Sequence, residues 1–386
     1  MKANFGSRLI FVGSSKLLLL ALLHPMFYLV HKTVKIKFAW LNNQVLGHMV
    51  FDTEIISIKS RKSGFNTVFI PINKMSVNEC VDLELRKKLI IKRSLILRFY
   101  MKALQSFFPK SPIIANANLN NDSWLMDNEP PLFEMTRIEK QNHLKILFNN
   151  SFAEESKVVG ICLRNHLYDE KNGRVENLSK FNIRNVDATR YETVIEKLIG
   201  LGFHVVKLDK FTDNKICIQS SLYFDYSNLR SDNECFDIRN CGVLDLCFST
   251  GLGLDNIVRA FRKPVFLLDF FNPVDIHISS LTPRMLPKVF KDARTNRFLT
   301  RRELEGLPLF RMRDDYTFEK EGVLLEQNSS ENLQSFAQEC LQDLRNTCKT
   351  DITTQKWYET ILKKNGVVPK SGMTPILSSV WPNLGL

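Results

Sequence analysis

The second half of the chain alternates short apolar runs with longer amphipathic segments, and this alternation limits the folds open to it. Runs typical of buried strands lie at 157–163 (KVVGICL), 203–208 (FHVVKL), 244–248 (LDLCF) and 264–269 (PVFLLD). The intervening segments with helical length and spacing are 134–148, 187–200 and 252–261. Strands that alternate with helices of this length form parallel βαβ units. We therefore expect a parallel α/β layer here.

The first half repeats the pattern on a smaller scale. We expect strands at 34–40 and 67–72 and helices at 48–58 and 77–89. Residues 109–131 are rich in Pro, Asn and Asp, which is typical of a linker. The predicted organisation is two α/β layers in series with a cleft between them. The expected parts are a basic apolar segment at 1–32, α/β domains at 33–130 and 131–345, and a tail at 346–386 that packs back on them.

Positive charge is concentrated in the first half. Residues 1–150 hold 21 Lys and Arg against 10 Asp and Glu, whereas residues 151–386 hold 32 against 31. The basic first half of the chain could face anionic lipid or a nucleic-acid backbone, or could simply be a solvated basic surface. The composition, 44% hydrophobic and 24% charged, excludes a collagen-like, coiled-coil or wholly disordered chain.

Residues 9–30 (LIFVGSSKLLLLALLHPMFYLV) form the most apolar segment. Lys16 and the His24-Pro25 pair interrupt it, so it is a poor match to a membrane span of about 20 mostly apolar residues. It also lacks a signal-peptide cleavage site. Two interpretations are open. One is an interfacial helix on an anionic membrane surface, and the other is a buried helix of the first domain.

The eight cysteines form no CxxC pair and no Cys/His cluster with zinc spacing. Several lie in apolar runs, as Cys162 and Cys247 do, where a free thiol behaves as a small apolar side chain. This pattern favours a reducing, cytoplasmic compartment.

The usual nucleotide signatures are absent from the sequence. There is no P-loop, and Gly251-Leu-Gly253 lacks the third glycine of a dinucleotide fingerprint. No DxD pair occurs, and Asp232-Asn-Glu234 is a weak substitute, which argues against a tightly held divalent metal. We expect no metal site and no cofactor.

Polar residues follow the predicted strands of the second domain. In open α/β sheets, ligands bind outside the carboxyl ends of the strands. The residues at those ends are Arg164-Asn165-His166, Lys207 to Asp209, Ser249-Thr250-Gly251 and Asp269 to Asn272. The Ser-Thr-Gly turn opens into a helix, where backbone N–H groups and hydroxyls suit a phosphate. Taken alone, Ser249 or Thr250 is better explained as an N-cap. Beside Arg164 and Lys207, a diphosphate site is the better interpretation.

These residues belong to a longer ordered set. It includes Gly160-Ile-Cys-Leu-Arg164-Asn165-His-Leu-Tyr168, Arg184-Asn185, Tyr191, Phe236-Asp237-Ile238, Thr250-Gly251-Leu252, Lys263-Pro264-Val265, Asn272-Pro273, Leu286-Pro-Lys288 and Asn328 to Glu331. In this order they resemble a family of bacterial surface-polysaccharide glycosyltransferases found in O-antigen and capsule gene clusters. Leu46-Gly47-His48 resembles the Gly-His turn of that family, so the resemblance is nearly full-length but weaker before residue 130.

The resemblance implies two Rossmann-like domains facing a cleft, the GT-B type, with the nucleotide-sugar donor on the second domain. The family is similar in this respect to fucosyltransferases, which bind the donor diphosphate without metal. Three positions depart from the family pattern. Arg164-Asn165 replaces Arg-Asp, Lys207-Leu-Asp209 replaces Arg-x-Gly, and Thr250-Gly251-Leu252 replaces Ser-Gly-Leu.

The expected site follows from the strand ends and the resemblance together. Arg164 is expected to be catalytic and to bind the donor, and the other expected donor-binding residues are Lys207, Asp237, Ser249, Thr250, Gly251, Asn272 and Lys288. Asp237 is equally well explained as a helix cap. Tyr168 and Phe236 are expected to pack, and His166 to lie on the surface.

His48 is the expected catalytic base. It follows Gly47 after the first predicted strand and opens a helix, and imidazole suits proton transfer near neutral pH. It could instead only cap the turn, and Asp52 or Glu54 would then be the base.

The function expected is metal-independent transfer of a sugar from a nucleotide sugar to a growing, lipid-linked surface glycan. The expected location is peripheral, at the inner face of the cell membrane. The alternative is a degenerate, non-catalytic protein that binds nucleotide or glycan in a polysaccharide assembly complex. A nucleic-acid partner is not expected, because the sequence lacks interleaved aromatic and basic residues and any recognisable binding module.

Overall fold

A computed structural model describes residues 4–149, 152, 155–167, 170, 182–211, 215–229, 233–345 and 351–384 of the chain. The chain divides into two compact units, which we call unit 1 (Met1–Leu119) and unit 2 (Asn120–Leu386). The division falls inside the predicted linker at 109–131. The later part of this linker, residues 120–131, packs on the rest of unit 2. The Ser123 hydroxyl donates to the Ile278 carbonyl at 2.8 Å, and Arg262 donates to the Pro130 carbonyl at 2.7 Å.

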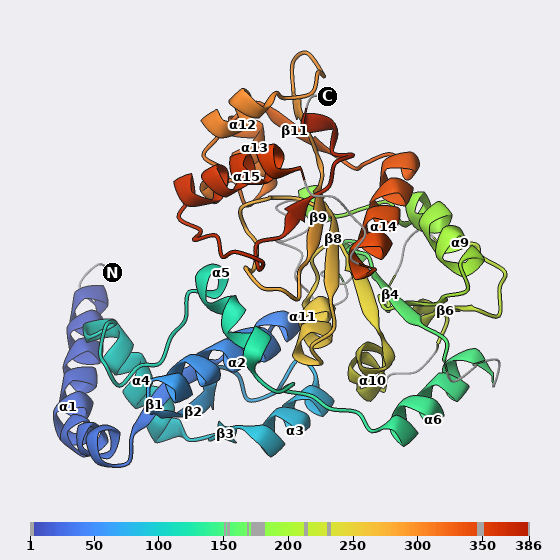
Figure 1. Cartoon of the computed structure of the whole chain (residues 1–386). Helices are drawn as coiled ribbons and strands as arrows, with labels where there is room; N and C mark the ends of the chain where they lie inside the picture. Colours follow the sequence, from blue (N-terminus) through green and yellow to red (C-terminus); the bar gives the residue numbers. More distant parts are fainter. Residues whose placement is uncertain are drawn as a thin grey trace. The chain divides into compact units, whose positions relative to one another are not determined.

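Unit 1 contains a three-stranded parallel sheet in the order β1 (Ile36–Leu41), β2 (Asn66–Pro71) and β3 (Ile90–Ile91). Helix α2 (Leu46–Lys62) connects β1 to β2, and α3 (Glu79–Lys88) connects β2 to β3 (Figure 1). The Asn78 side chain caps α3 by accepting from the Val81 N–H. The predicted strand–helix order of this half is confirmed.

Helices α1 (Asn4–Thr33) and α4 (Leu95–Phe107) pack together in unit 1. Leu20 and Phe27 of α1 are buried with Phe38 of β1 and with Tyr100 and Leu104 of α4. One face of α1 therefore belongs to the core, as the second interpretation of residues 9–30 expected. Within the part of the chain that is described, no helix is long and apolar enough to cross a membrane.

Unit 2 is built on a seven-stranded sheet in which every neighbouring pair is parallel. Its spatial order is β12 (Ile376–Leu377), β9 (Arg284–Pro287), β8 (Val265–Phe270), β7 (Leu246–Ser249), β4 (Val158–Cys162), β5 (His204–Lys207) and β6 (Tyr223–Asp225). Strands β4, β7 and β8 are buried along their whole length. Cys162 and Cys247 are buried free thiols in β4 and β7. The predicted parallel α/β layer is confirmed.

Helices cover this sheet on both sides. Helix α9 (Glu192–Gly200) packs with α14 (Ser330–Leu344), and α10 (Cys235–Val243) packs with both α6 (Arg137–Phe148) and α11 (Gly253–Ala260) (Figure 1). A two-stranded antiparallel ribbon, β10 (Val289–Asp292) and β11 (Val323–Glu326), lies outside the main sheet. The described part of the chain also contains the short helices α5 (Leu119–Asp122), α12 (Arg301–Gly306) and α13 (Asp315–Lys320).

The C-terminal segment is an integral part of unit 2. Helix α15 (Ile352–Lys364) leads to β12, which extends the main sheet beside β9. The indole of Trp381 donates to the Lys288 carbonyl at 3.0 Å. Asn383 accepts from the Phe290 N–H and donates to the carbonyls of Phe290 and Leu299 at 2.6 to 2.9 Å. These bonds hold the chain end against the segment that carries Lys288.

Candidate functional site

The strand order of unit 2 reverses between β4 and β7. From β4 the chain builds outward to β5 and β6, then returns to the other side of β4 and builds β7, β8 and β9. At such a switch point the two connections leave in opposite directions, which opens a crevice at the carboxyl ends of the two strands. In unit 2 these ends are followed by Arg164 and by the Ser249-Thr250-Gly251 turn.

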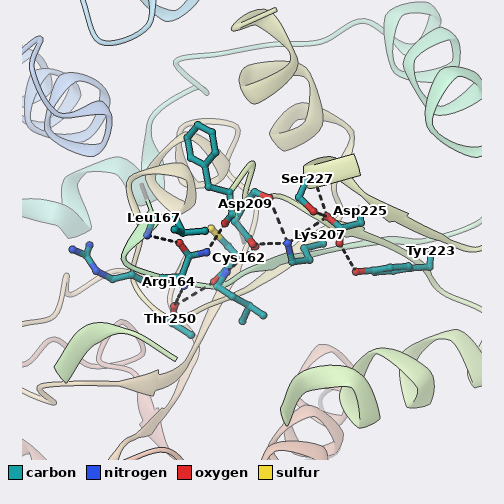
Figure 2. Close-up of polar contacts among 12 residues, drawn as sticks. Cys162, Arg164, Leu167, Lys207, Asp209, Tyr223, Asp225, Ser227 and Thr250 are labelled. Carbon is teal, nitrogen blue, oxygen red and sulfur yellow. Dashed lines mark hydrogen bonds and ion pairs between the residues drawn. The ribbon is translucent and has the colours of Figure 1, made fainter. Parts of the chain in front are cut away.

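Hydrogen bonds join the two strand ends directly (Figure 2). The Arg164 N–H donates to the Thr250 hydroxyl oxygen at 2.8 Å, and the Thr250 N–H donates to the Cys162 carbonyl at 3.0 Å. The Thr250 hydroxyl also lies 3.5 Å from that carbonyl. The prediction that these residues meet at one edge of the sheet is confirmed.

The Ser249-Thr250-Gly251 turn is stabilised from within. The buried Ser249 hydroxyl donates to the Asp255 carboxylate at 2.9 Å and accepts from the Gly251 N–H at 3.0 Å. Asp255 also accepts from the Leu252 N–H at 3.2 Å, and so caps α11. Gly251 has φ +89°, and a Cβ there would lie 2.7 Å from the Phe270 ring, so only glycine fits.

This bonding changes the expected role of the turn. The hydroxyls of Ser249 and Thr250 and the N–H groups of Gly251 and Leu252 are already engaged within the protein. The Asp255 carboxylate adds negative charge where a phosphate was expected. Ser249, Thr250 and Gly251 therefore shape the crevice, and the positive charge needed by an anionic ligand has to come from side chains.

Two arginines lie beside this turn. Arg164 is half-buried, and its guanidinium points away from the other side chains drawn in Figure 2. Arg184, in the short 3-10 helix Asn182–Arg184, donates to the Gly251 carbonyl at 3.4 Å and lies over the Phe271 ring, 4.9 Å from its centroid. The sequence analysis did not select Arg184 as a site residue, because it follows no strand. Its only signal was the Arg184-Asn185 pair of the resemblance.

Lys207 is engaged inside the protein, which argues against its expected diphosphate contact. Its side chain is fully buried, with the ammonium 2.6 Å from the Asp209 carboxylate and 3.3 Å from the Asp225 carboxylate (Figure 2). Asp209 accepts in addition from the Leu163 N–H at 3.2 Å. Burial raises the pKa of Asp209, and the charge of Lys207 partly offsets this effect. The charge of Lys207 is therefore used inside the protein.

Asn272 is also structural, and its expected donor contact is corrected. The buried amide donates to the carbonyls of Leu309 and Met312 at 2.8 and 2.7 Å and accepts from the Val274 N–H at 3.0 Å. Asn165 has a similar function: its amide donates to the Phe211 carbonyl, and its carbonyl accepts from the Leu167 N–H at 3.0 Å. Both asparagines fix loops at the carboxyl edge of the sheet.

Asp237 lies half-buried in the first turn of α10, where a carboxylate is favoured by the helix dipole. Its contact with a ribose or sugar stays a prediction. Phe236 packs as expected, with its ring 5.2 Å from that of His143 and 6.1 Å from that of Tyr226. Tyr168 lies outside the described residues.

A cavity of about 640 Å³ adjoins the crevice. Its lining includes His166, Asn185, Val186, Lys288 and Asp315. It is connected to the strand end, because the Val186 N–H donates to the Arg164 carbonyl at 3.0 Å. His166, expected on the surface, is half-buried in this lining. The crevice and this cavity together are the candidate site of unit 2.

Lys288 is the cationic residue of the cavity wall. Its ammonium donates to the Asn185 carbonyl at 2.7 Å, and burial lowers its pKa to about 8. Behind it, the buried Asp269 accepts from the Tyr191 hydroxyl at 2.5 Å and from the N–H and amide of Asn328. Asp269 has φ +46°, a strained conformation for a non-glycine residue. These bonds hold the end of β8 against the segment that carries Lys288.

His48 lies in the first turn of α2, after the carboxyl end of β1 in unit 1. Its side chain is 51% exposed, and its Nδ1 lies 3.0 Å from the Asp52 carboxylate. Glu54, by contrast, is buried. The structure thus makes Asp52 a partner of His48, an arrangement in which the carboxylate orients the ring. Which of the two residues acts as the base stays a prediction.

Within the described ranges, no group of three or more His, Cys, Asp or Glu side chains is arranged to hold a metal ion.

Comparisons with known proteins give weak matches. No protein-family model matches the chain, and no curated protein matches it. Among solved structures, it is similar to E. coli ADP-heptose LPS heptosyltransferase II, with 10% identity and a TM-score of 0.36, over 65% of this chain and 90% of that one.

Two further structures match at the same level. A family 9 glycosyl transferase from Veillonella parvula has 9% identity and a TM-score of 0.34, over 62% of this chain and 80% of that one. The iron-containing heptosyltransferase TibC, in complex with ADP-D-beta-D-heptose, has 9% identity and a TM-score of 0.33, over 60% and 57% of the two chains. Likeness this low does not identify the activity of this chain.

The buried position of Lys207 leads to a stability prediction. We expect Lys207→Met to lower the free energy of unfolding at pH 7 by about 3–5 kcal/mol, because it leaves two carboxylates buried without their cation. The deficit should shrink as the pH falls from 7 to 5, since protonation removes the uncompensated charge and the pKa of Asp209 is already raised. Urea denaturation at several pH values measures both effects.

The matched control for this variant is Lys215→Met, which removes the same charge from an exposed position of unit 2. Combining Lys207→Met with Asp225→Asn should restore part of the lost stability. A Lys207→Met protein as stable as the control would contradict the structural role.

Proposed function

We propose that the protein is a glycosyltransferase that takes a sugar from a nucleotide-sugar donor bound at the crevice between β4 and β7. The observation that carries this proposal is the position of Arg164, whose N–H is bonded to Thr250 at the point where the strand order reverses. The resemblance to surface-polysaccharide glycosyltransferases supports it, because Arg164 and Thr250-Gly251-Leu252 belong to the resembling set.

The chemistry of the site suits a diphosphate leaving group. When the bond between the sugar C1 and the donor phosphate oxygen breaks, negative charge develops on the nucleoside diphosphate. Guanidinium groups make bidentate hydrogen bonds to phosphate oxygens. Fixed cations near the developing charge lower the activation barrier for breaking the donor bond. Arg164 and Arg184 lie beside the turn that forms the crevice, and Lys288 lies on the wall of the adjoining cavity. In this proposal these protein cations balance the charge.

The acceptor and the base belong to unit 1. The acceptor hydroxyl attacks C1, the new C1–O bond forms, and the hydroxyl proton goes to His48 if the reaction inverts the anomeric centre. The Asp52 carboxylate accepts a hydrogen bond from the Nδ1–H of His48 and stabilises the imidazolium that results, without taking the proton itself. The exposed His48 side chain is accessible to an acceptor.

The proposed acceptor is a lipid-linked surface glycan, and the proposed location is the inner face of the cell membrane. The resemblance to O-antigen and capsule glycosyltransferases supports both. The basic character of unit 1 is also consistent with work beside an anionic surface.

A second candidate function is binding without catalysis, as a partner in polysaccharide assembly. The observation that favours it is the loss of two expected anion contacts. Lys207 is buried between carboxylates, and Asp255 occupies the N-terminus of α11. The two functions differ in one measurement: both bind nucleotide, but only the first releases nucleoside diphosphate from a donor in the presence of acceptor.

The direct experiment is a panel of nucleotide sugars and nucleoside diphosphates tested for thermal stabilisation of the protein. A ligand that binds only the folded state raises the melting temperature as its concentration rises. Stabilisation by members of one nucleotide class is expected. Failure of every nucleotide to stabilise the protein would overturn the transferase and the nucleotide-binding form of the second function, and would leave only glycan binding.

The first prediction from this proposal concerns Arg164. We expect Arg164→Ala to weaken nucleotide binding and to lower turnover by roughly 10²-fold or more, because a charge-assisted contact in the site is lost. Arg164→Lys should recover little, since an ammonium cannot make the two-pronged contact. Calorimetry measures binding, and release of nucleoside diphosphate measures turnover.

The control is Arg302→Ala, which removes an exposed arginine of α12 in the same unit. A correctly folded Arg164→Ala protein with the affinity of this control would remove Arg164 from the site.

The second prediction concerns pH. Lys288 is charged below pH 8 and loses its proton as the pH rises through about 8, which is well below the usual range for lysine. Affinity for the best nucleotide sugar of the panel should therefore fall by roughly tenfold between pH 6.5 and 9, a range in which its diphosphate does not titrate. Titration calorimetry at fixed ionic strength measures the dependence.

Lys288→Met should bind weakly at every pH and show no such slope. The exposed Lys320→Met variant should keep the slope of the unsubstituted protein. An unchanged slope in Lys288→Met would assign the pH dependence to another group.

The third prediction concerns His48. We expect His48→Ala to bind the donor normally but to lower transfer by roughly 10²–10⁴-fold, because the acceptor hydroxyl loses its base. His48→Gln keeps the size and hydrogen bonding but not the basicity, and should be nearly as damaged. The transfer rate of Asp52→Asn should lie between the rates of these variants and the rate of the unsubstituted protein. Normal turnover in His48→Gln would reduce His48 to a hydrogen-bonding role.

A further inference from the structure

Helix α1 exposes apolar side chains on the side opposite to its buried face. At 100° per residue, Leu20, Phe27 and His31 fall within an arc of about 40°, and all three are buried. Leu18, Leu22, Met26 and Leu29 fall within an arc of about 80° on the other side, and they are 51% to 69% exposed. A helix that is apolar on both sides normally has both sides covered. The core of unit 1 accounts for one side only.

Helix α4, which packs against α1, adds a second exposed apolar stripe. Leu95, Ile96 and Phe99 are 60% to 65% exposed, and Phe107 and Phe108 at the end of the helix are also exposed. The two helices meet through His24, whose ring lies 6.4 Å from that of Tyr100 and 6.5 Å from that of Phe108. We call the exposed residues of these two helices the α1–α4 face. Exposed apolar area of this extent marks an interaction site.

The charge of unit 1 identifies the kind of partner. Unit 1 holds 18 Lys and Arg against 5 Asp and Glu, a net charge of +13, whereas the whole chain has a net charge of +12. All of the excess positive charge is therefore in unit 1. Exposed lysines lie at the end of α1 and around α4: Lys32, Lys35, Lys92, Lys102 and Lys110.

We propose that the α1–α4 face docks unit 1 on an anionic lipid bilayer. Its apolar side chains enter the interfacial region, while the surrounding lysines contact the headgroups. Burial of apolar area and attraction to anionic lipid together are what hold an interfacial helix on a membrane. The apolar face therefore accounts for insertion, and the charge accounts for lipid selectivity.

A second copy of the chain is a poorer occupant than lipid. Two units 1 that met through this face would bring two charges of +13 together, and like charges oppose such an interface. An anionic bilayer is attracted by the same charge. The inference deepens the proposed location at the membrane and rests on no step of the sugar transfer, because vesicle binding needs no donor and no turnover. Failure of vesicle binding would remove the proposed location and leave sugar transfer open to its own test.

The experiment measures co-sedimentation of the full chain with vesicles of phosphatidylcholine alone and of phosphatidylcholine with about 30% phosphatidylglycerol. We expect binding to the anionic vesicles that weakens several-fold when NaCl rises from about 0.1 to 0.5 M, as screening predicts. Equal binding to neutral and anionic vesicles, or no binding to either, would overturn the proposal.

Substitutions then test the face itself. Ile96→Gln with Phe99→Gln, and separately Leu22→Gln with Met26→Gln, should each weaken binding by about tenfold or more, because inserted apolar area is lost. The matched control is Phe298→Gln with Ile352→Gln, which changes two exposed apolar side chains of unit 2. Melting temperatures check that the variants fold, and the substituted residues are already exposed.

Two results would overturn the assignment of the face. One is binding by both double variants that equals the binding of the control. The other is a dimer in lipid-free sedimentation that these substitutions convert to a monomer, which would make a second copy the occupant.

Discussion

The pairing of β4 with β7 is the constraint on which the rest of unit 2 depends. These strands are adjacent in the sheet although β5 and β6 lie between them in the chain, so the connections on either side of the pair diverge. The divergence opens the crevice, and the bond from the Arg164 N–H to Thr250 fixes the two strand ends relative to each other. Gly160, in the middle of β4, is closely surrounded, since a Cβ there would lie 2.5 Å from the end of the Leu244 side chain and 3.2 Å from the Cys247 sulfur. The β4–β7 pair is therefore closely packed.

The site also shows how burial decides which charges are available to a ligand. Lys207 is the last residue of β5, and Arg164 follows the end of the neighbouring strand β4. Both side chains are cationic. Lys207 lies at the end of β5 with its side chain turned into the protein, where two carboxylates neutralise it. Arg164 comes two residues after the last residue of β4 and extends away from the same cluster (Figure 2). A cation at the last residue of a strand, as Lys207 is, can thus be structural, whereas one placed two residues later, as Arg164 is, can be a candidate ligand contact.

The two units differ in how their charge and apolar surface are distributed, and this difference matches their proposed partners. In unit 2, Arg164 and Arg184 lie beside the crevice, while the cavity is lined by the buried Lys288 together with Asp187, Asp315 and Glu319. The net charge of the unit is close to zero. In unit 1, the positive charge is spread over the surface and accompanies exposed apolar helices. A spread charge is suited to an extended anionic surface, because its effect is the sum of many weak contacts. The His48–Asp52 pair lies in unit 1, where a surface-bound acceptor would be presented.

The sequence alone determined the elements and their class. Its buried apolar runs, such as 157–163 and 264–269, predicted β4 and β8, and the strand–helix alternation predicted the parallel sheets. The strand-end rule also placed Arg164 beside Ser249-Thr250-Gly251, because it needs only strand order and direction. Only the tertiary structure decided which polar groups are already bonded. Asp225, Asp255 and Met312, the partners that engage Lys207, Ser249 and Asn272 inside the protein, are 18, 6 and 40 residues away, so no local pattern reveals them. Helix α4 was missed although its signals are local, since Ser94 caps it and its apolar residues recur at helical spacing. Only its contact with α1 depended on how the chain folds back.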